Sequence, residues 1–126
     1  MGRLRPRPTD SELAILRVLW ERGPSTVREV HEAIVRTRDT GYTTTLKLMQ
    51  IMAEKGLVTR NEQSRTHIYE ASAGEAETQH ELVKDLVDRA FGGSASTLVM
   101  RALSEHTTDE ELREIRKLID DYREKR

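Results

Sequence analysis

The spacing of apolar residues predicts two helices at the start of the chain. Thr9 is followed three residues later by Glu12, the spacing of a capping box, and an apolar face repeats behind them until a Gly-Pro pair ends the helix. A second helix is predicted after Ser25 or Thr26, because hydroxyl residues often cap helix N-termini. The apolar positions of the two helices are Leu13, Ile15, Leu16, Leu19, Trp20, Val27, Val30 and Ile34.

A third helix is predicted over residues 43–55, where a stripe of buried positions recurs every three or four residues. Gly56 is the expected C-terminal cap, since glycine readily adopts a left-handed backbone. Two extended segments, 57–60 and 67–69, flank a polar stretch and predict a hairpin. The buried stripe of the third helix is expected to be Thr45, Leu48, Met49 and Met52.

Three more amphipathic helices are predicted in the second half of the chain. The first ends at Phe91-Gly92-Gly93, the second is short, and the third opens at Thr108 with Glu111 in capping-box spacing. Three short helices cannot enclose much apolar surface, so pairing with a second copy of the chain would bury their stripes in a homodimer. The predicted dimerisation positions are Leu82, Leu86, Leu98, Leu103, Leu112, Ile115, Ile119 and Tyr122.

Together, these elements predict a mainly α fold with a small β wing of two or three strands. Three helices followed by a hairpin is the order of a winged helix-turn-helix. Residues 1–71 would form the winged-helix DNA-binding domain, and residues 72–126 a C-terminal helical dimerisation domain.

Composition narrows the classes of function. The 126 residues include no cysteine, which excludes disulfides, thiolate zinc sites and cysteine nucleophiles. No apolar run reaches the roughly 18 residues of a membrane span, and no signal peptide is visible. We therefore expect no membrane insertion and a cytoplasmic location.

Charge differs between the two halves of the sequence. Residues 1–72 hold 12 Lys or Arg against 9 Asp or Glu, a balance of +3. Residues 73–126 hold 9 against 13, a balance of −4. This asymmetry indicates that the first half meets a polyanion and the second does not.

The third helix carries the candidate DNA-reading residues. Outside its buried stripe it has short hydroxyls at the helix start, which can bond phosphates or base edges, and then a lysine and a glutamine, which can read guanine and adenine. Arginines of the second helix and the hairpin are candidates for contacts with the DNA backbone. The predicted DNA-binding positions are Thr43, Thr44, Lys47, Gln50, Ile51, Arg28, Arg60 and Arg65.

Two other functions fit parts of the sequence. A winged helix can serve as a protein–protein adaptor, which Leu46, Ile51 and Glu54 on the third helix would favour. A His/carboxylate metal-responsive regulator would use some of the four histidines, although none stands in a His-Glu-x-x-His motif. No constellation of residues indicates an enzyme, so we assign no catalytic residue, metal ligand or cofactor.

Several segments, in this order and spacing, resemble the penicillinase-repressor (BlaI/MecI) family of winged-helix regulators over about residues 9–122. The resemblance implies a homodimer that binds a palindromic double-stranded DNA operator and represses genes linked to antibiotic resistance. In many members of the family, a membrane-bound sensor metalloprotease detects β-lactams, and the repressor is then cleaved in its C-terminal part. The matching segments are Gly41-Tyr42-Thr43-Thr44-Thr45-Leu46 through Lys55-Gly56-Leu57-Val58, Glu12-Leu13 through Leu19-Trp20, Thr26-Val27-Arg28-Glu29-Val30, Phe91-Gly92-Gly93-Ser94 and Leu98-Val99.

The sequence departs from that family at three points. The cleaved bond of its best-known members is Asn-Phe just after the Leu-Val stretch, whereas this chain has Met100-Arg101-Ala102 there, so the resemblance does not extend to cleavage of that bond. The lack of cysteine separates the chain from the copper-responsive branch. Ile51 stands where arginine is common, which predicts an operator with an apolar contact at that point.

Overall fold

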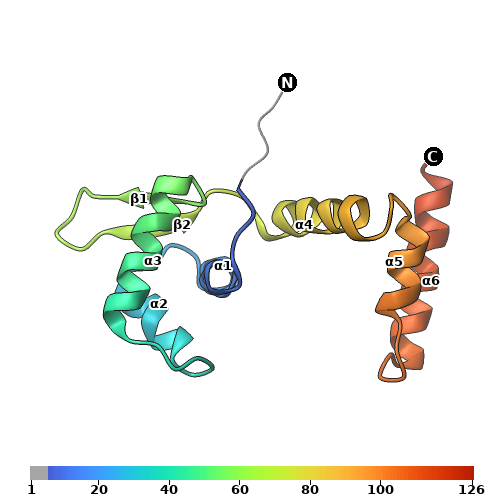
Figure 1. Cartoon of the computed structure of the whole chain (residues 1–126), viewed down its shortest axis with the longest axis horizontal. Coiled ribbons are helices and arrows are strands. Elements are labelled where there is room, and N and C mark those ends of the chain that lie inside the picture. The colour runs from blue at the N-terminus through green and yellow to red at the C-terminus, as the bar shows by residue number, and fades with distance from the viewer. Residues whose placement is uncertain (1–5) are drawn as a thin grey trace. The chain divides into compact units, whose positions relative to one another are not determined.

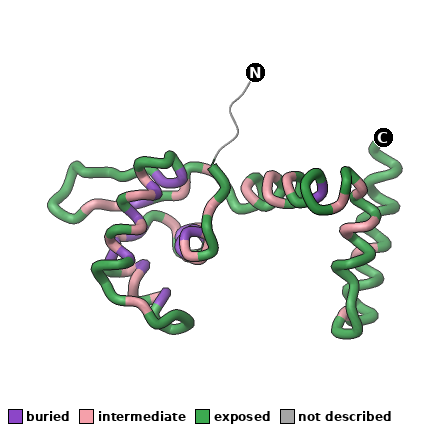
Figure 2. Tube along the Cα trace, viewed as in Figure 1, coloured by how far each residue is buried: buried purple, intermediate pink, exposed green. Residues whose placement is uncertain are grey.

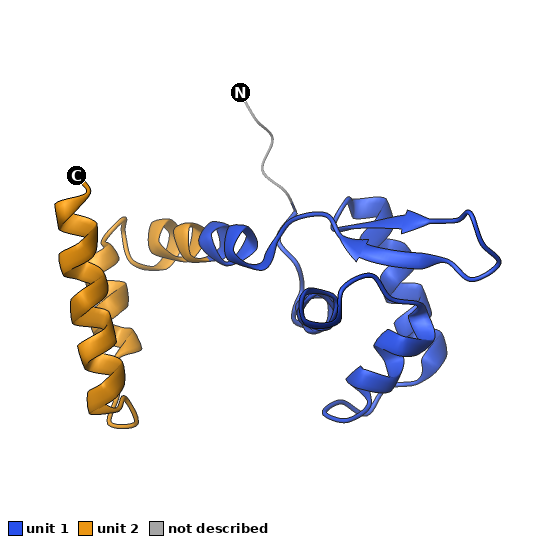
Figure 3. Cartoon of the chain, turned by 180° about the vertical axis from the view of Figure 1, so that it is seen from behind, with its two compact units in different colours: residues 1–82 blue, residues 83–126 orange. Residues whose placement is uncertain are grey.

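The computed structural model describes residues 6–126 and divides the chain into two compact units, one ending at Leu82 and the other spanning Val83–Arg126 (Figure 3). In chain order the elements are α1 (Asp10–Arg22), α2 (Val27–Ile34), α3 (Tyr42–Lys55), β1 (Val58–Asn61), β2 (Ile68–Ala71), α4 (Glu75–Ala90), α5 (Ala95–Ala102) and α6 (Asp109–Glu124) (Figure 1). The division into units falls inside α4, whereas the predicted domain boundary lies before it. A mainly α fold with one small hairpin is confirmed.

Side-chain caps fix the starts of α1, α2 and α6. At each, a threonine hydroxyl accepts the backbone N–H three residues on, and the glutamate there accepts the N–H of the threonine. The capping boxes predicted at Thr9 and Thr108 are confirmed, and Thr26 rather than Ser25 caps α2. Gly56 ends α3 with a φ of 83°, the left-handed conformation predicted for this cap.

The first unit encloses one hydrophobic core between its three helices and the hairpin (Figure 2). The strands pair antiparallel with Val58 opposite Ala71. Ser25 and Tyr69 exchange two backbone hydrogen bonds of 3.0 and 2.8 Å, which tie the hairpin to the segment before α2 in place of a third strand. The buried apolar residues are Ile15, Leu16, Leu19, Val27, Val30, Ile34, Met49, Met52, Leu57, Val58 and Tyr69.

Several predicted boundaries and burial positions shift slightly. The third helix starts one residue earlier than expected, at Tyr42, and each strand starts one residue later. Leu57 is nevertheless buried, because its N–H bonds the Met52 carbonyl at 2.9 Å and turns the chain back onto the core. On α1 the sequence pattern was wrong at one position, since Glu12 is fully buried while Leu13 is only half-buried.

The second unit has almost no core within one chain. Of the described residues in α4, α5 and α6, only Val87 is buried. Extensive packing between the described elements is confined to the three helices and two strands of the first unit. Large apolar side chains therefore stay in water, with Tyr122 69% and Leu118 66% exposed. Among the predicted dimerisation positions the half-buried ones are Leu82, Leu98 and Ile115, and the exposed ones are Leu86, Leu103, Leu112, Ile119 and Tyr122.

Candidate DNA interface

The outward face of α3 presents the polar residues that the sequence predicts. Thr43, Thr44, Lys47 and Gln50 are exposed, and Ile51 is half-buried. The opposite face of the helix packs into the core, which fixes its rotation about its own axis. The helix starts without a side-chain cap, so its first backbone N–H groups are available to an acceptor outside the helix.

Polar contacts hold α3 at both ends. Near its start, the buried Thr45 hydroxyl lies 2.9 Å from Nδ1 of His31 in α2. At its end, the Lys55 ammonium lies 2.8 Å from the carboxylate of Glu12 in α1. The Glu12 side chain is 2% exposed and that of Lys55 36% exposed, so one partner is buried and the other reaches solvent.

The charge of Glu12 is maintained by these partners. Burial alone would raise the pKa of its carboxyl, but hydrogen bonds from the Lys55 ammonium and from the backbone N–H of Thr9 outweigh burial and lower the pKa. Glu12 is therefore ionised at neutral pH. The ion pair fixes the C-terminal end of α3 against the start of α1.

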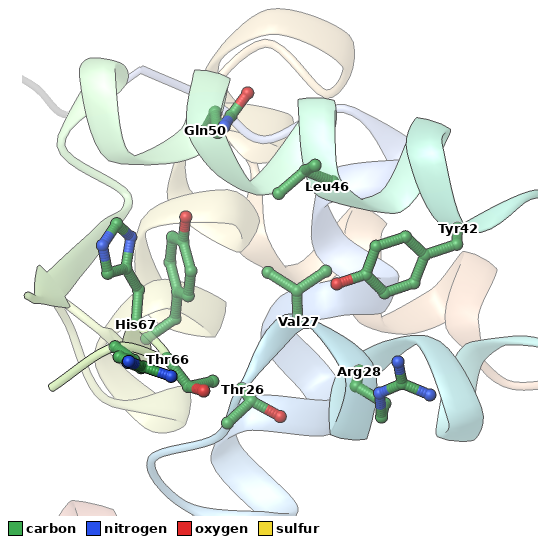
Figure 4. A pocket seen from close by; sticks show the side chains of 10 residues that line it. Thr26, Val27, Arg28, Tyr42, Leu46, Gln50, Thr66 and His67 are labelled. Carbon is green, nitrogen blue, oxygen red and sulfur yellow. The ribbon is translucent and has the colours of Figure 1, made fainter.

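A cleft of about 330 Å³ lies between α2, α3 and the hairpin (Figure 4). Its apolar lining comes from Val27, Leu46 and Tyr69, and none of the described residues that line it is acidic. A concave surface with neutral and basic donors attracts an anion such as the phosphate backbone of DNA. The polar side chains along the cleft are Thr26, Arg28, Tyr42, Gln50, Arg65, Thr66 and His67.

The structure separates the three arginines of the predicted site. Arg28 and Arg65 line the cleft. Arg60 borders a different hollow of about 290 Å³, and its guanidinium lies 3.0 Å from the Glu62 carboxylate. Hydrogen bonds to the Tyr69 hydroxyl and to Glu62 raise the pKa of Arg60. Arg60 thus already has two partners inside the hairpin, which makes Arg28 and Arg65 the better placed cations.

Sequence reasoning does not include Tyr42 and His67 in the site, although both line the cleft. Tyr42 was placed just before the third helix, but it is the first helical residue and is 43% exposed. Tyr42 directly follows Gly41, the N-cap of α3, and this local signal could have assigned it to the helix and to the site. The pair of Glu12 and Lys55 joins residues 43 positions apart, so no local pattern reveals it.

Comparison with known proteins assigns the chain to a family. The family described as "Penicillinase repressor" matches residues 8–121. This chain belongs to the penicillinase repressor family. Among its relatives, the transcriptional regulator BlaI of Mycobacterium tuberculosis is 39% identical over 82 residues, which are 64% of this chain and 59% of that protein, so the match spans about three fifths of that relative. The penicillinase repressor of Bacillus licheniformis is 18% identical over 122 residues, 96% of this chain and 95% of that protein.

Solved structures of BlaI share the fold of about three fifths of this chain. The DNA-binding domain of the repressor BlaI superposes with a TM-score of 0.52 at 20% identity, over 60% of this chain and 93% of that one. The monomeric form of Bacillus licheniformis BlaI, solved in complex with the blaP half-operator, gives the same TM-score and identity over 59% of this chain and 90% of that one. The predicted winged-helix fold is confirmed.

The histidines lie on separate elements: His31 in α2, His67 just before β2, His80 in α4 and His106 between α5 and α6. Within residues 6–126, no group of three or more His, Asp or Glu side chains is arranged to hold a metal ion. In the same part of the chain, every helix is too short or too polar to cross a membrane.

Proposed function

We propose that this protein is a homodimeric transcriptional repressor that binds double-stranded DNA at a palindromic operator. The observation that carries this proposal is the cleft beside α3, whose lining, within residues 6–126, holds arginines and neutral donors and no acidic residue. Membership of the penicillinase repressor family supports it. So does the shared fold with the monomeric form of BlaI that was solved in complex with a half-operator.

In this proposal α3 enters the major groove. Lys47 and Gln50, both exposed on its outward face, meet base edges, where lysine donates to guanine and glutamine pairs with adenine. Thr43 and Thr44 stand at the start of the helix, where hydroxyls and free backbone N–H groups bond phosphates. Ile51 offers an apolar surface to a thymine methyl group.

The backbone contacts come from α2 and the hairpin. Arg28 and Arg65 reach the cleft from two different elements, so they can hold successive phosphates of one strand. Arg60 contributes less, because its guanidinium is engaged by Glu62 at 3.0 Å. Contacts of this kind set the position of the protein on DNA and make binding depend on salt.

The second unit supplies the dimer. Most of its large apolar side chains are exposed in one chain. The seam of α6 repeats every three and four residues, as paired helices require. Two-fold pairing would present two copies of α3 to successive major grooves. The operator is then a palindrome with half-sites about one helical turn apart or a small multiple of it.

The proposal is tested by a gel shift and a footprint on the DNA upstream of the protein's own gene, with salt titrated, and by sedimentation of the free protein. We expect a dimer and one symmetric protected site that is bound far more tightly than a random duplex. Equal and weak binding to every duplex at modest salt would contradict DNA reading. It would favour the adaptor function instead.

A further inference from the structure

We propose that Tyr42 makes an additional DNA contact, in which its phenol hydroxyl donates to a backbone phosphate, and that His31 is the residue that positions its ring. This inference rests on the proposed function, because it adds one contact to the way in which the protein holds its operator. Neither residue belongs to the set predicted from the sequence.

Tyr42 is exposed where a DNA contact would need it. It is the first residue of α3 and 43% of its surface is accessible, although aromatic side chains in this unit are otherwise largely covered. Figure 4 shows its hydroxyl directed toward Val27 and the cleft, with Arg28 beside it. A tyrosine hydroxyl is one of the side-chain donors that commonly bond phosphate oxygens.

The orientation of the Tyr42 ring is set by His31. The two ring centroids lie 5.6 Å apart with an interplanar angle of 82°, an edge-to-face pair. His31 comes from the last turn of α2, so the contact fixes the tyrosine against a different helix. A side chain held in this way loses less conformational freedom when it binds.

The ring of His31 is itself fixed by a hydrogen-bonded chain. The Thr45 hydroxyl lies 2.9 Å from Nδ1 of His31 and 3.4 Å from the Gly41 carbonyl, which is within hydrogen-bond distance of both groups. Thr45 is 1% exposed, so the core anchors the arrangement of Gly41, Thr45, His31 and Tyr42.

The position of Tyr42 favours a phosphate over a base. Tyr42 precedes the base-reading candidate Gln50 by about 12 Å along the axis of α3, given a rise of 1.5 Å per residue. The margin of a helix in the major groove is where it meets the sugar-phosphate backbone. The neighbouring cation is Arg28, and the cleft toward which the hydroxyl points has no acidic lining that would repel a phosphate.

The test uses the full chain and two duplexes of equal length, one with the footprinted site and one of random sequence, in fluorescence anisotropy at several salt concentrations. Tyr42→Phe removes the hydroxyl alone from a half-exposed position, so folding should be unaffected. We expect it to weaken binding about tenfold or more on both duplexes, the usual size of a lost hydrogen bond to a charged group. The salt dependence should not change, because a phenol releases no counterion.

His31 is tested by a double-mutant cycle. We expect His31→Ala to weaken binding in the wild-type background and to have little further effect in the Tyr42→Phe background, because it acts through the hydroxyl. The matched control is Glu12→Gln, which breaks the contact at the other end of α3. The loss of binding free energy caused by Glu12→Gln should add fully to the loss caused by Tyr42→Phe, because Glu12→Gln displaces α3 as a whole and does not act through the Tyr42 hydroxyl.

Three results would overturn the inference. Unchanged binding of Tyr42→Phe, or a loss confined to the footprinted site, would remove the phosphate contact. Full additivity of His31→Ala and Tyr42→Phe would remove the positioning role. If the wild-type chain bound neither duplex, the proposed function itself would fail, which is distinguishable from failure of the tyrosine variant alone.

Discussion

The two units of this chain differ in how far their apolar side chains are buried. In the first unit Val30, Met49 and Met52 are 0% exposed, and the helices and hairpin around them need no partner. In the second unit Leu118 and Tyr122 are mostly exposed. The first unit is therefore stabilised by its own core, whereas the proposed dimer would stabilise the second and make its stability depend on protein concentration.

The units also differ in electrostatics. The excess of basic residues lies before residue 73 and the excess of acidic residues after it. Arg28 and Arg65 meet in a cleft without acidic lining, whereas α6 begins with Asp109, Glu110 and Glu111. An acidic second half would repel DNA, so in the proposed function the first unit provides the surface that binds it.

The largest expected effect comes from breaking the proposed dimer. Leu112→Asp combined with Ile119→Asp puts charges on the apolar seam of α6 and should give monomers. Operator affinity should fall by about 100-fold or more, because the two half-sites are then bound independently. Sedimentation and gel shift measure both effects. The control is Arg113→Asp with Lys117→Asp on the exposed polar side of α6, and this variant should stay dimeric. If the variant with Leu112→Asp and Ile119→Asp also stayed dimeric, the dimer interface would lie elsewhere.

Two side-chain truncations test whether the first unit has a buried core and the second does not. Met49→Ala should lower the free energy of unfolding of the first unit by about 2–5 kcal/mol, because it leaves a cavity. Leu118→Ala, at a position 66% exposed, should change it by no more than about 0.5 kcal/mol. Urea unfolding followed by the fluorescence of Trp20, the only tryptophan of the chain, reports on the first unit. An equal decrease in the free energy of unfolding in the two variants would contradict the difference in burial between the two units.

Replacing one lysine in each unit distinguishes a contact with a base from non-specific electrostatic attraction to DNA. Lys47→Ala should weaken binding to the footprinted site by about tenfold or more and binding to a random duplex much less, since it removes a base contact. Lys84→Ala, an exposed lysine of α4, should leave both affinities nearly unchanged. Competition gel shifts with the two duplexes make the comparison. An equal loss on both duplexes would reassign Lys47 to the phosphates.

The smallest effect is expected at the ion pair of the first unit. Glu12→Gln should lower the free energy of unfolding by about 1–2 kcal/mol at neutral pH, less than for a fully buried pair because Lys55 reaches solvent. The pKa of Glu12 is lowered on folding from its ordinary 4.5. The stabilisation is therefore fully present above pH 4.5 and is lost as the pH falls through the folded pKa.

Urea unfolding at several pH values checks this sign. The difference between wild type and Glu12→Gln should shrink below pH 4.5. The control is Glu21→Gln on the exposed side of the same helix, which should show no such trend. A difference that persisted unchanged in acid would contradict the role of the charged carboxylate.

The local features of the fold were predictable because each depends on neighbours in the sequence. A threonine and a glutamate three residues apart are sufficient to specify the caps at Thr9 and Thr108. Gly56 ends α3 because it takes a φ of 83° at little cost. The exposed face of α3 also follows from its periodicity, which is why Thr43, Thr44, Lys47 and Gln50 were placed correctly on the surface.

The rest depends on side-chain contacts that form only when the chain folds. Periodicity places Leu13 on the apolar face of α1, yet Glu12 is the buried residue, because folding brings Lys55 to its carboxylate. The sequence treats Arg60 and Arg65 alike, but only the folded hairpin supplies Glu62 and Tyr69 as partners for Arg60.

The sequence by itself determined the helices, their caps, the polar face of α3 and the charge difference between the halves, since these follow from propensity and composition along the chain. Only the tertiary structure decided which polar groups are engaged and which remain available to DNA. Tyr42 shows why: its ring is held by His31 from another helix, and its hydroxyl points toward a cleft that does not exist until α2, α3 and the hairpin have packed together.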